Sequence, residues 1–181
     1  MYNVLLVDDE RIILEGIASV VDWEALGTRL VGKVLNGKHA WELIQEQQPH
    51  IVITDIKMPE MDGLELIEKT REKYPEIVFI ILSGHEHFSL AQSAMKLGVR
   101  HYLLKPCNEH KIMQVLEEVV EELKEMERRG AFILNNKANF AKVLPKLKEQ
   151  FLKEAITNKT YGEREWQYYG RLLGIDIAGK P

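Results

Sequence analysis

Acidic residues directly follow two apolar runs of this sequence. Asp8 and Asp9 close the run at residues 4–7, and Asp55 closes the run at residues 51–54. Buried parallel strands read as short apolar runs without alternation, and ligands bind beyond their carboxyl ends. Crowded carboxylates resist ionising together unless a cation compensates them, and a cluster of hard oxygen ligands suits Mg²⁺. The sequence therefore predicts an acidic pocket with Mg²⁺ as its cofactor.

A hydroxyl group and an amine follow two further apolar runs. Ser83 follows one of these runs, and Lys105 with Pro106 follows the other. An aspartate is able to act as a nucleophile that carries an acyl phosphate. Phosphoryl transfer needs an in-line nucleophile, a cation at the phosphoryl oxygens and donor groups around them. We therefore predict that Asp55 attacks phosphorus, that Lys105 pairs with the phosphoryl group and that Ser83 donates a hydrogen bond to it.

The spacing of apolar residues predicts five strands that alternate with five helices. The strands are expected at residues 4–7, 30–35, 51–54, 77–82 and 102–104. The helices are expected at residues 11–21, 38–48, 64–73, 88–97 and 108–129. Repeated strand-helix-strand units predict right-handed crossovers and an α/β fold, with a parallel sheet covered by helices on both faces.

Length and composition limit the class of protein. A chain of 181 residues holds one ordinary domain with an appendage. The net charge of −4 gives no global basic surface for nucleic acid. No apolar run is long enough to span a bilayer, and the first residues do not form a cleavable signal, so we expect a cytoplasmic protein without membrane contact. The single cysteine, Cys107, excludes an internal disulfide and is expected to be a small packing residue.

The fifth predicted helix is longer than a sheet of this size needs. Its apolar residues keep a four-three spacing, at Ile112, Leu116, Val119, Leu123 and Met126. The first half suits packing against its own domain. The second half suits either that packing or a coiled-coil seam with a second copy of the chain, and the sequence leaves both uses open.

The character of the sequence changes after the fifth helix. Asn135, Asn136 and Asn139 predict a polar joint, Pro145 predicts the start of another helix, and residues 163–173 predict one more. This stretch is apolar, but it is too small for an independent core. We expect it to be the beginning of a larger unit, so that the chain is a fragment of a longer protein.

Four motifs resemble, in chain order and spacing, the receiver domain of two-component response regulators over roughly residues 1–128. They are Asp8-Asp9, residues 54–59 with Asp62-Gly63, Ser83-Gly84 and Lys105-Pro106. The resemblance implies a flavodoxin-like (βα)5 fold with a parallel sheet of order 2-1-3-4-5. It also implies that Asp55 accepts a phosphoryl group from the phosphohistidine of a sensor histidine kinase, and that the Lys105-Pro106 peptide is cis.

The resemblance also implies the metal ligands. Asp9, Asp55 and the main-chain carbonyl of Lys57 would hold Mg²⁺, with Asp8 contributing through water. Lys57 and His85 occupy positions that flank the phosphate in receivers, where side chains shield or admit the hydrolytic water. We expect these two residues to tune the lifetime of the phosphate.

A switch residue follows from the same resemblance. Tyr102 matches the position of an aromatic side chain that turns inward as the hydroxyl residue, here Ser83, engages the phosphoryl group. Phosphorylation of Asp55 is then expected to change the face formed by the fourth helix, fifth strand and fifth helix. A homodimer is expected through this receiver face or through the extended fifth helix. A half-buried tyrosine at the edge of the sheet, without switching, is the alternative.

A narrower likeness rests on residues 21–27, on Leu82-Ser83-Gly84 with Phe88, and on residues 103–106. These resemble the YesN-like group of response regulators, whose receivers precede a helical middle region and an AraC-type DNA-binding domain. Residues 129–181 are expected to be a linker and part of that middle region. Because the sequence has no pair of helix-turn-helix motifs, DNA binding is expected only through an output domain that this chain lacks.

Two other functions would share the acidic pocket. A Mg²⁺-dependent aspartyl phosphatase typically carries a second acid two residues after its nucleophile, but this position is Lys57. A receiver-like protein that no longer accepts phosphate would work by dimerisation, and the intact set of acids argues against it. Dinucleotide binding is excluded because Asp8, Asp9 and Glu10 stand where a glycine-rich turn is needed. We predict a signalling phosphoacceptor rather than an enzyme.

Overall fold

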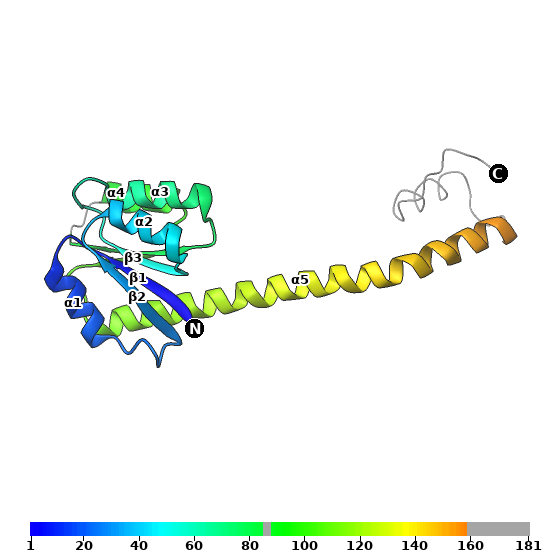
Figure 1. Ribbon diagram of the computed structural model, residues 1–181, viewed down its shortest axis with the longest axis horizontal. Coiled ribbons are helices and arrows are strands. Elements are labelled where there is room, and N and C mark those ends of the chain that lie inside the picture. The colour runs from blue at the N-terminus through cyan, green and yellow to red at the C-terminus, as the bar shows by residue number, and fades with distance from the viewer. Residues whose placement is uncertain (85–87, 159–181) are drawn as a thin grey trace. The chain divides into compact units, whose positions relative to one another are not determined.

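The computed structural model describes residues 1–84 and 88–158 of the chain (Figure 1). Five parallel strands form one sheet in the order β2-β1-β3-β4-β5. The strands are β1 Tyr2–Val7, β2 Thr28–Val34, β3 Ile51–Thr54, β4 Val78–Ser83 and β5 His101–Leu104. The predicted fold class and strand order are confirmed.

Helices cover both faces of the sheet (Figure 1). They are α1 Arg11–Val20, α2 Gly37–Gln47, α3 Gly63–Lys73, α4 Phe88–Lys96 and α5 Glu109–Asn158. Helix α1 and the first turns of α5 bury apolar side chains such as Leu14 and Leu116 against one face. Helices α2, α3 and α4 bury a second set, including Ile44 and Leu66, against the other face. The sheet therefore lies between two helical layers.

Polar side chains mark the start of three helices. Asn36 before α2 and Asp62 before α3 each accept a hydrogen bond from the backbone N–H three residues further along the chain. Asn108 before α5 accepts the equivalent bond at 3.0 Å. Such oxygens satisfy N–H groups that have no partner within the helix, so they fix where each helix begins. Asn108 therefore marks the start of α5.

The register of the sheet brings the ends of four strands to one edge. Val7 pairs with Thr54 across β1 and β3, and Ser83 pairs with Leu104 across β4 and β5. Residues that follow these strands therefore share the carboxyl edge of the sheet, where ligands bind in open parallel sheets. This edge carries the acids after β1 and β3, the last residue of β4 and the lysine after β5.

The predicted break after the fifth helix is wrong. Helix α5 is continuous from Glu109 to Asn158 and contains Pro145 in its interior. Each asparagine of the expected polar joint costs less than about 1 kcal/mol in a helix, and the alanines, leucines and lysines around them are strong helix formers. Proline removes one helical hydrogen bond without ending the surrounding turns. The helix expected at residues 163–173 lies outside the described residues.

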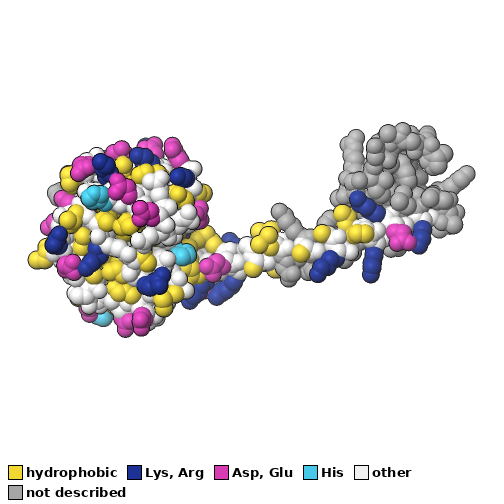
Figure 2. All heavy atoms as spheres, in the orientation of Figure 1, with side chains coloured by type: hydrophobic (Ala, Val, Ile, Leu, Met, Phe, Trp, Pro, Cys, Tyr) yellow, Lys and Arg dark blue, Asp and Glu magenta, His cyan; other side chains and the backbone are white. Residues whose placement is uncertain are grey.

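The chain divides into two compact units, the first of which covers Met1–Lys124. The second is described over residues 125–158, where large apolar side chains lie exposed along α5 (Figure 2). They include Met126, Phe132, Ile133 and Leu134. Within the part of the chain that the structure describes, no helix combines the length and the apolar character needed to cross a bilayer.

Candidate functional site

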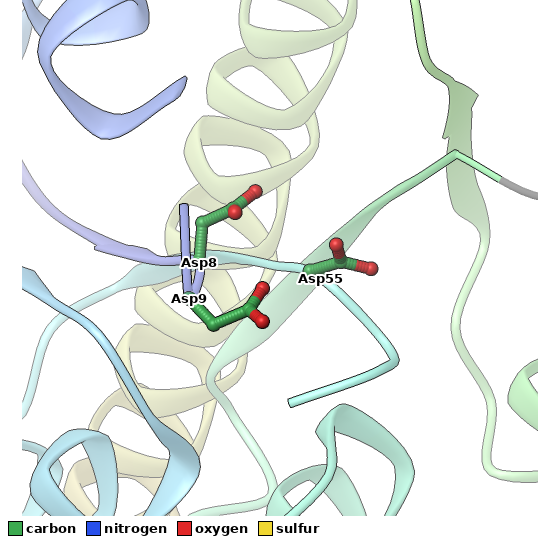
Figure 3. A group of neighbouring side chains, drawn as sticks. All are labelled: Asp8, Asp9 and Asp55. Atoms are coloured by element: carbon green, nitrogen blue, oxygen red, sulfur yellow. The ribbon is translucent and has the colours of Figure 1, made fainter. Parts of the chain in front are cut away.

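Three carboxylates gather at the carboxyl edge of the sheet (Figure 3). Asp8 and Asp9 follow β1, Asp55 follows β3, and one oxygen of each carboxylate lies within 4.8 Å of the others. Asp8 and Asp55 are buried, whereas Asp9 is exposed. The acidic pocket predicted from the ends of two apolar runs is therefore present, because β1 and β3 are adjacent strands.

The ammonium group of Lys105 lies between two of these carboxylates. Its Nζ atom is 2.6 Å from Oδ2 of Asp8 and 2.8 Å from Oδ2 of Asp55. Oε1 of Glu10 is a more distant partner at 3.7 Å. The Lys105 side chain is only 13% exposed. It reaches from the end of β5 to the ends of β1 and β3, so one largely buried cation joins three strands.

Burial and charge shift the pKa values of Asp8 and Lys105. Burial raises the pKa of Asp8 above its ordinary value, and the hydrogen bonds from Lys105 and from the backbone of Glu10 offset only part of this effect. Burial alone would lower the pKa of Lys105, but its hydrogen bonds to Asp55 and Asp8 outweigh burial and raise the pKa. The lysine therefore stays charged, whereas burial resists the ionisation of Asp8.

The charge and the ligand type of the pocket fit a divalent cation. When all groups are ionised, three carboxylates and one ammonium group leave a formal charge of −3 + 1 = −2. A Mg²⁺ ion would cancel this charge, and it prefers oxygen ligands, usually one or two carboxylates with several waters. The exposed carboxylate of Asp9 gives such an ion access from solvent. The residues present therefore fit Mg²⁺.

Backbone groups also hold the Asp55 carboxylate. Its Oδ1 atom accepts a hydrogen bond from the N–H of Ile56 at 2.5 Å, with the N–H of Lys57 at a weaker 3.4 Å. The N–H of Asp55 itself donates to the carbonyl of Val7 on β1. The two carboxylate oxygens therefore have different partners, since Oδ2 accepts from Lys105. This difference fixes the orientation of the carboxylate.

Ser83 and Pro106 lie at the same edge of the sheet. Ser83 is buried at the end of β4, and its carbonyl accepts a hydrogen bond from the N–H of Lys105 at 2.8 Å. The Lys105-Pro106 peptide is cis. The residue expected to donate to a phosphoryl group is therefore linked directly to the lysine expected to pair with it.

The remaining predicted residues differ in their surroundings. Tyr102 is half-buried on β5 and packs against the apolar cluster of α2, α3 and α4. Lys57 is exposed in the loop after β3, and His85 lies outside the described residues. Cys107 packs against the apolar cluster of α1 and α5, and burial raises the pKa of its thiol. A raised pKa suits a packing cysteine better than a reactive one.

Sequence reasoning missed three contacts of the site. The Glu10 carboxylate lies near Lys105, the Thr54 hydroxyl donates to the carbonyl of Asp55, and a Cβ added to Gly63 would collide with that same carbonyl. Glu10 could have been suggested by its place directly after the acid pair. Thr54 gave no separate signal, because a β-branched residue is ordinary in a strand. The contact of Gly63 depends on how α3 packs.

The fold and the site together define a class of protein. Residues 4–117 match the family model of the response regulator receiver domain. This match covers more than half of the chain, and it agrees with the parallel sheet of order 2-1-3-4-5 and with the aspartates and lysine at its carboxyl edge. The chain belongs to the response regulator receiver family.

The sequence is similar to two proteins that are named as transcriptional regulators. The chain is 59% identical over 124 residues to the uncharacterized transcriptional regulatory protein YesN of Bacillus subtilis (strain 168), an overlap of 68% of this chain and 34% of that protein. It is 33% identical over 130 residues to the transcriptional regulatory protein HptR of Staphylococcus aureus (strain NCTC 8325 / PS 47), which is 72% of this chain and 51% of that protein. The chain thus spans about a third to a half of these relatives.

Solved structures agree with this placement. The receiver domain of AraT, a response regulator from Geobacillus stearothermophilus, matches with a TM-score of 0.67 and 37% identity, over 70% of this chain and 98% of that one. A two-component transcriptional regulator AraC from Clostridium phytofermentans ISDg matches with a TM-score of 0.66 and 27% identity, over the same shares. The predicted likeness to YesN-like receivers with AraC-type relatives is confirmed.

Proposed function

We propose that this chain is the phosphoacceptor module of a two-component system. In this proposal Asp55 receives a phosphoryl group from the phosphohistidine of a sensor histidine kinase, with Mg²⁺ as cofactor. One observation carries the proposal: the largely buried ammonium group of Lys105 bridges the proposed nucleophile and Asp8, an acid of the proposed metal site. An acidic loop without chemistry would not need a largely buried cation from a strand distant in the sequence.

The groups at the site divide the chemistry among them. An oxygen of Asp55 attacks phosphorus in line and forms a P–O bond, while the P–N bond of the phosphohistidine breaks and its electron pair returns to the imidazole nitrogen. The ammonium group of Lys105 pairs with the transferred phosphoryl group, and the Ser83 hydroxyl donates to one of its oxygens. Mg²⁺, held by Asp9, Asp55 and the main-chain carbonyl of Lys57, supplies positive charge there when bound.

The module is proposed to store a signal rather than to turn over a substrate. The position two residues after Asp55 is an exposed lysine, Lys57, so a general acid for rapid release is absent from that place. The acyl phosphate then decays by slow attack of water. We propose that Lys57 and His85 set this rate by shielding or admitting the water.

Ser83 and Tyr102 are proposed to transmit the phosphorylated state. Ser83 ends β4, and Tyr102 lies on the neighbouring β5, opposite Ile81 of β4. Phosphorylation adds negative charge at Asp55, which draws the Ser83 hydroxyl toward it, and the Tyr102 ring turns inward. The face formed by α4, β5 and α5 then changes its preference for a partner.

A second copy of the chain is the proposed partner, through that face or through α5. The side chains of Met126 and Ile133 on α5 are 49% and 55% exposed. Both continue the four-three spacing that begins at Ile112 and Leu116. Pairing of two such helices would bury this stripe, as in a coiled coil.

The proposed output is DNA binding by an AraC-type domain outside this chain. Two of the relatives above are named as transcriptional regulatory proteins, and both extend well beyond the length that this chain covers. In this proposal the kinase acts on the receiver, and the receiver controls the DNA-binding domain through its dimer. Residues 1–181 would then not bind an operator by themselves.

Incubation with Mg²⁺ and acetyl phosphate, followed by intact mass spectrometry, tests the proposal. We expect a mass increase of one phosphoryl group that survives acid and is lost in base, because the product is an acyl phosphate. The Asp55→Asn variant is expected to gain no phosphate. Removal of Mg²⁺ with EDTA is expected to abolish the modification of the wild-type chain.

Asp62→Asn is the matched control. Asp62 is an exposed acid in the same loop, and it caps α3 through its side-chain oxygen, a role that asparagine fills equally well. This variant is expected to gain phosphate at the wild-type rate. An unmodified wild-type chain, or equal amounts of phosphate on the wild type and on Asp55→Asn, would contradict the proposal.

A further inference from the structure

The hydroxyl group of Thr54 is buried beside Asp55 and has no part in the chemistry described above. Thr54 is fully buried, and its Oγ1 atom donates a hydrogen bond to the main-chain carbonyl of Asp55 at 2.8 Å. At the other end of the same peptide unit, the N–H of Ile56 donates to Oδ1 of Asp55 at 2.5 Å. Because a peptide unit is planar and rigid, it links the Thr54 hydroxyl to the side-chain oxygen of Asp55.

Helix α3 holds the same stretch of backbone from another direction. The N–H of Gly63, the first residue of α3, donates to the carbonyl of Ile56 at 2.8 Å. A Cβ added to Gly63 would collide with the Asp55 carbonyl and lie 3.0 Å from the Cα of Ile56. The backbone of the proposed phosphoacceptor is thus packed tightly against α3, and the Thr54 hydroxyl supplies a directional bond on the β3 side.

We propose that Thr54 is a positioning residue for phosphoryl acceptance by Asp55, an inference that rests on the proposed function. The Thr54 hydroxyl keeps the peptide between Asp55 and Ile56 in the plane that aims the Ile56 N–H at Oδ1. The carboxylate then keeps one orientation, with Oδ2 toward Lys105. Loss of this bond slows the reaction without removing any group that touches phosphorus, because near-attack geometry tolerates little misplacement.

A purely structural role predicts a different outcome, and a second threonine of the chain separates the two. Thr28 is also fully buried, and its Oγ1 atom donates to a backbone carbonyl, that of Trp23, at the same 2.8 Å. Thr28 begins β2, at the amino end of the strand, so its bond does not reach the carboxyl edge. Replacing either hydroxyl removes a hydrogen bond of the same length from a fully buried threonine to a backbone carbonyl, but only Thr54 is joined to the Asp55 peptide.

The experiment compares Thr54→Val, Thr54→Ser and Thr28→Val with the wild-type chain. The rate of phosphorylation by acetyl phosphate is measured by intact mass at saturating Mg²⁺, at a temperature where circular dichroism shows every variant folded. Thr54→Val is expected to react about 10-fold more slowly, and Thr54→Ser to return to within about twofold of the wild-type rate. Thr28→Val is expected to react at the wild-type rate.

An NMR measurement reports on the peptide itself. The amide proton of Ile56 is expected to shift in Thr54→Val, because its bond to Oδ1 is disturbed, and to regain the wild-type position in Thr54→Ser. It is expected to stay in place in Thr28→Val. A structural role of the threonine in the strand would not move this signal selectively.

Three results would overturn the inference. They are a wild-type rate in Thr54→Val, a rate in Thr54→Ser as low as that of Thr54→Val, and an equal loss of rate in Thr28→Val. In each of these cases the wild-type chain still accepts phosphate, so the proposed function stands. A wild-type chain that accepts no phosphate would instead overturn the proposed function, and this inference with it.

Discussion

The carboxyl edge of the sheet and residues 125–158 of α5 are held by different kinds of contact. At the edge, Lys105 bonds to Asp8 and Asp55, which lie 97 and 50 positions away in the sequence. In residues 125–158, the ion pairs among described side chains join residues three or four positions apart. The contacts at the edge therefore depend on the whole fold, whereas the described ion pairs of the later part of α5 are local to the helix. Substitutions should have large effects at the edge and small effects along the later helix.

Replacing Lys105 by methionine is expected to have the largest effect. The variant leaves Asp8 and Asp55 in the pocket without their shared cation, and breaking a buried pair in this way costs about 3–5 kcal/mol of unfolding free energy. Urea unfolding at pH 7 in EDTA measures the loss. The loss should shrink as the pH falls below 7, because burial raises the pKa of Asp8 and protonation removes the uncompensated charge.

Lys33→Met is the control for that prediction. Lys33 forms an ion pair with Glu15 at 2.6 Å, the same distance as between Lys105 and Asp8, but the two side chains are 33% and 60% exposed. Exposed pairs contribute less than about 1 kcal/mol, so the variant should unfold close to the wild-type urea concentration. Equal losses of unfolding free energy in Lys105→Met and Lys33→Met would contradict the expected difference between the ion pairs at the edge and an ordinary surface ion pair.

Two substitutions within α5 sharpen the comparison along a single helix. Leu116 is fully buried against the sheet, and its change to alanine is expected to lower the unfolding free energy by about 2–5 kcal/mol. Ile133 is 55% exposed, and its change to alanine is expected to alter the unfolding free energy of the monomer by less than about 0.5 kcal/mol. Urea unfolding at low protein concentration measures both effects.

The same pair of variants tests the proposed dimer. If two copies pair along α5, Ile133→Ala weakens the dimer, and sedimentation at high protein concentration shows more monomer than in the wild type. A large loss of monomer stability in Ile133→Ala would mean instead that this side chain is covered within its own chain, contrary to its exposure.

The parts of the molecule that sequence predicted well are those fixed by several signals at once. The strand that precedes Asp55 was predicted from its apolar run, and the helix that follows was predicted at residues 64–73 from the spacing of its apolar residues. The strand and helix patterns also predicted that Asp8 and Lys105 lie at one edge of the sheet, because strands joined by right-handed crossovers run parallel and end on the same side. The hydroxyl contact of Thr54 could not be predicted, because it depends on a side-chain rotation that strand pattern does not set.

The error at Pro145 has a different cause. Asparagine and proline are breakers on average, and a short stretch of sequence does not show whether the neighbouring turns outweigh them. In residues 125–158, the ion pairs among described side chains join residues within the same helix. Local propensity therefore decides the outcome, and the several strong helix formers on both sides of Asn139 continue the helix.

Replacing Pro145 by alanine tests this interpretation. Among these substitutions it is expected to change the stability of the sheet least, because its effect is confined to the turns around residue 145. In the interior of a helix, proline costs up to about 3 kcal/mol relative to alanine, because it removes a hydrogen bond and crowds the preceding turn. Hydrogen exchange of the full chain should therefore show slower exchange of the amides in the turns around residue 145, with the exchange of β1 and β3 unchanged. Pro75→Ala is the control: Pro75 lies in the turn before β4, so this substitution should leave hydrogen exchange around residue 145 of α5 unchanged. If Pro145 instead stood in the first turn of a separate helix, its missing N–H would cost nothing there, and the substitution would leave exchange around it unaltered.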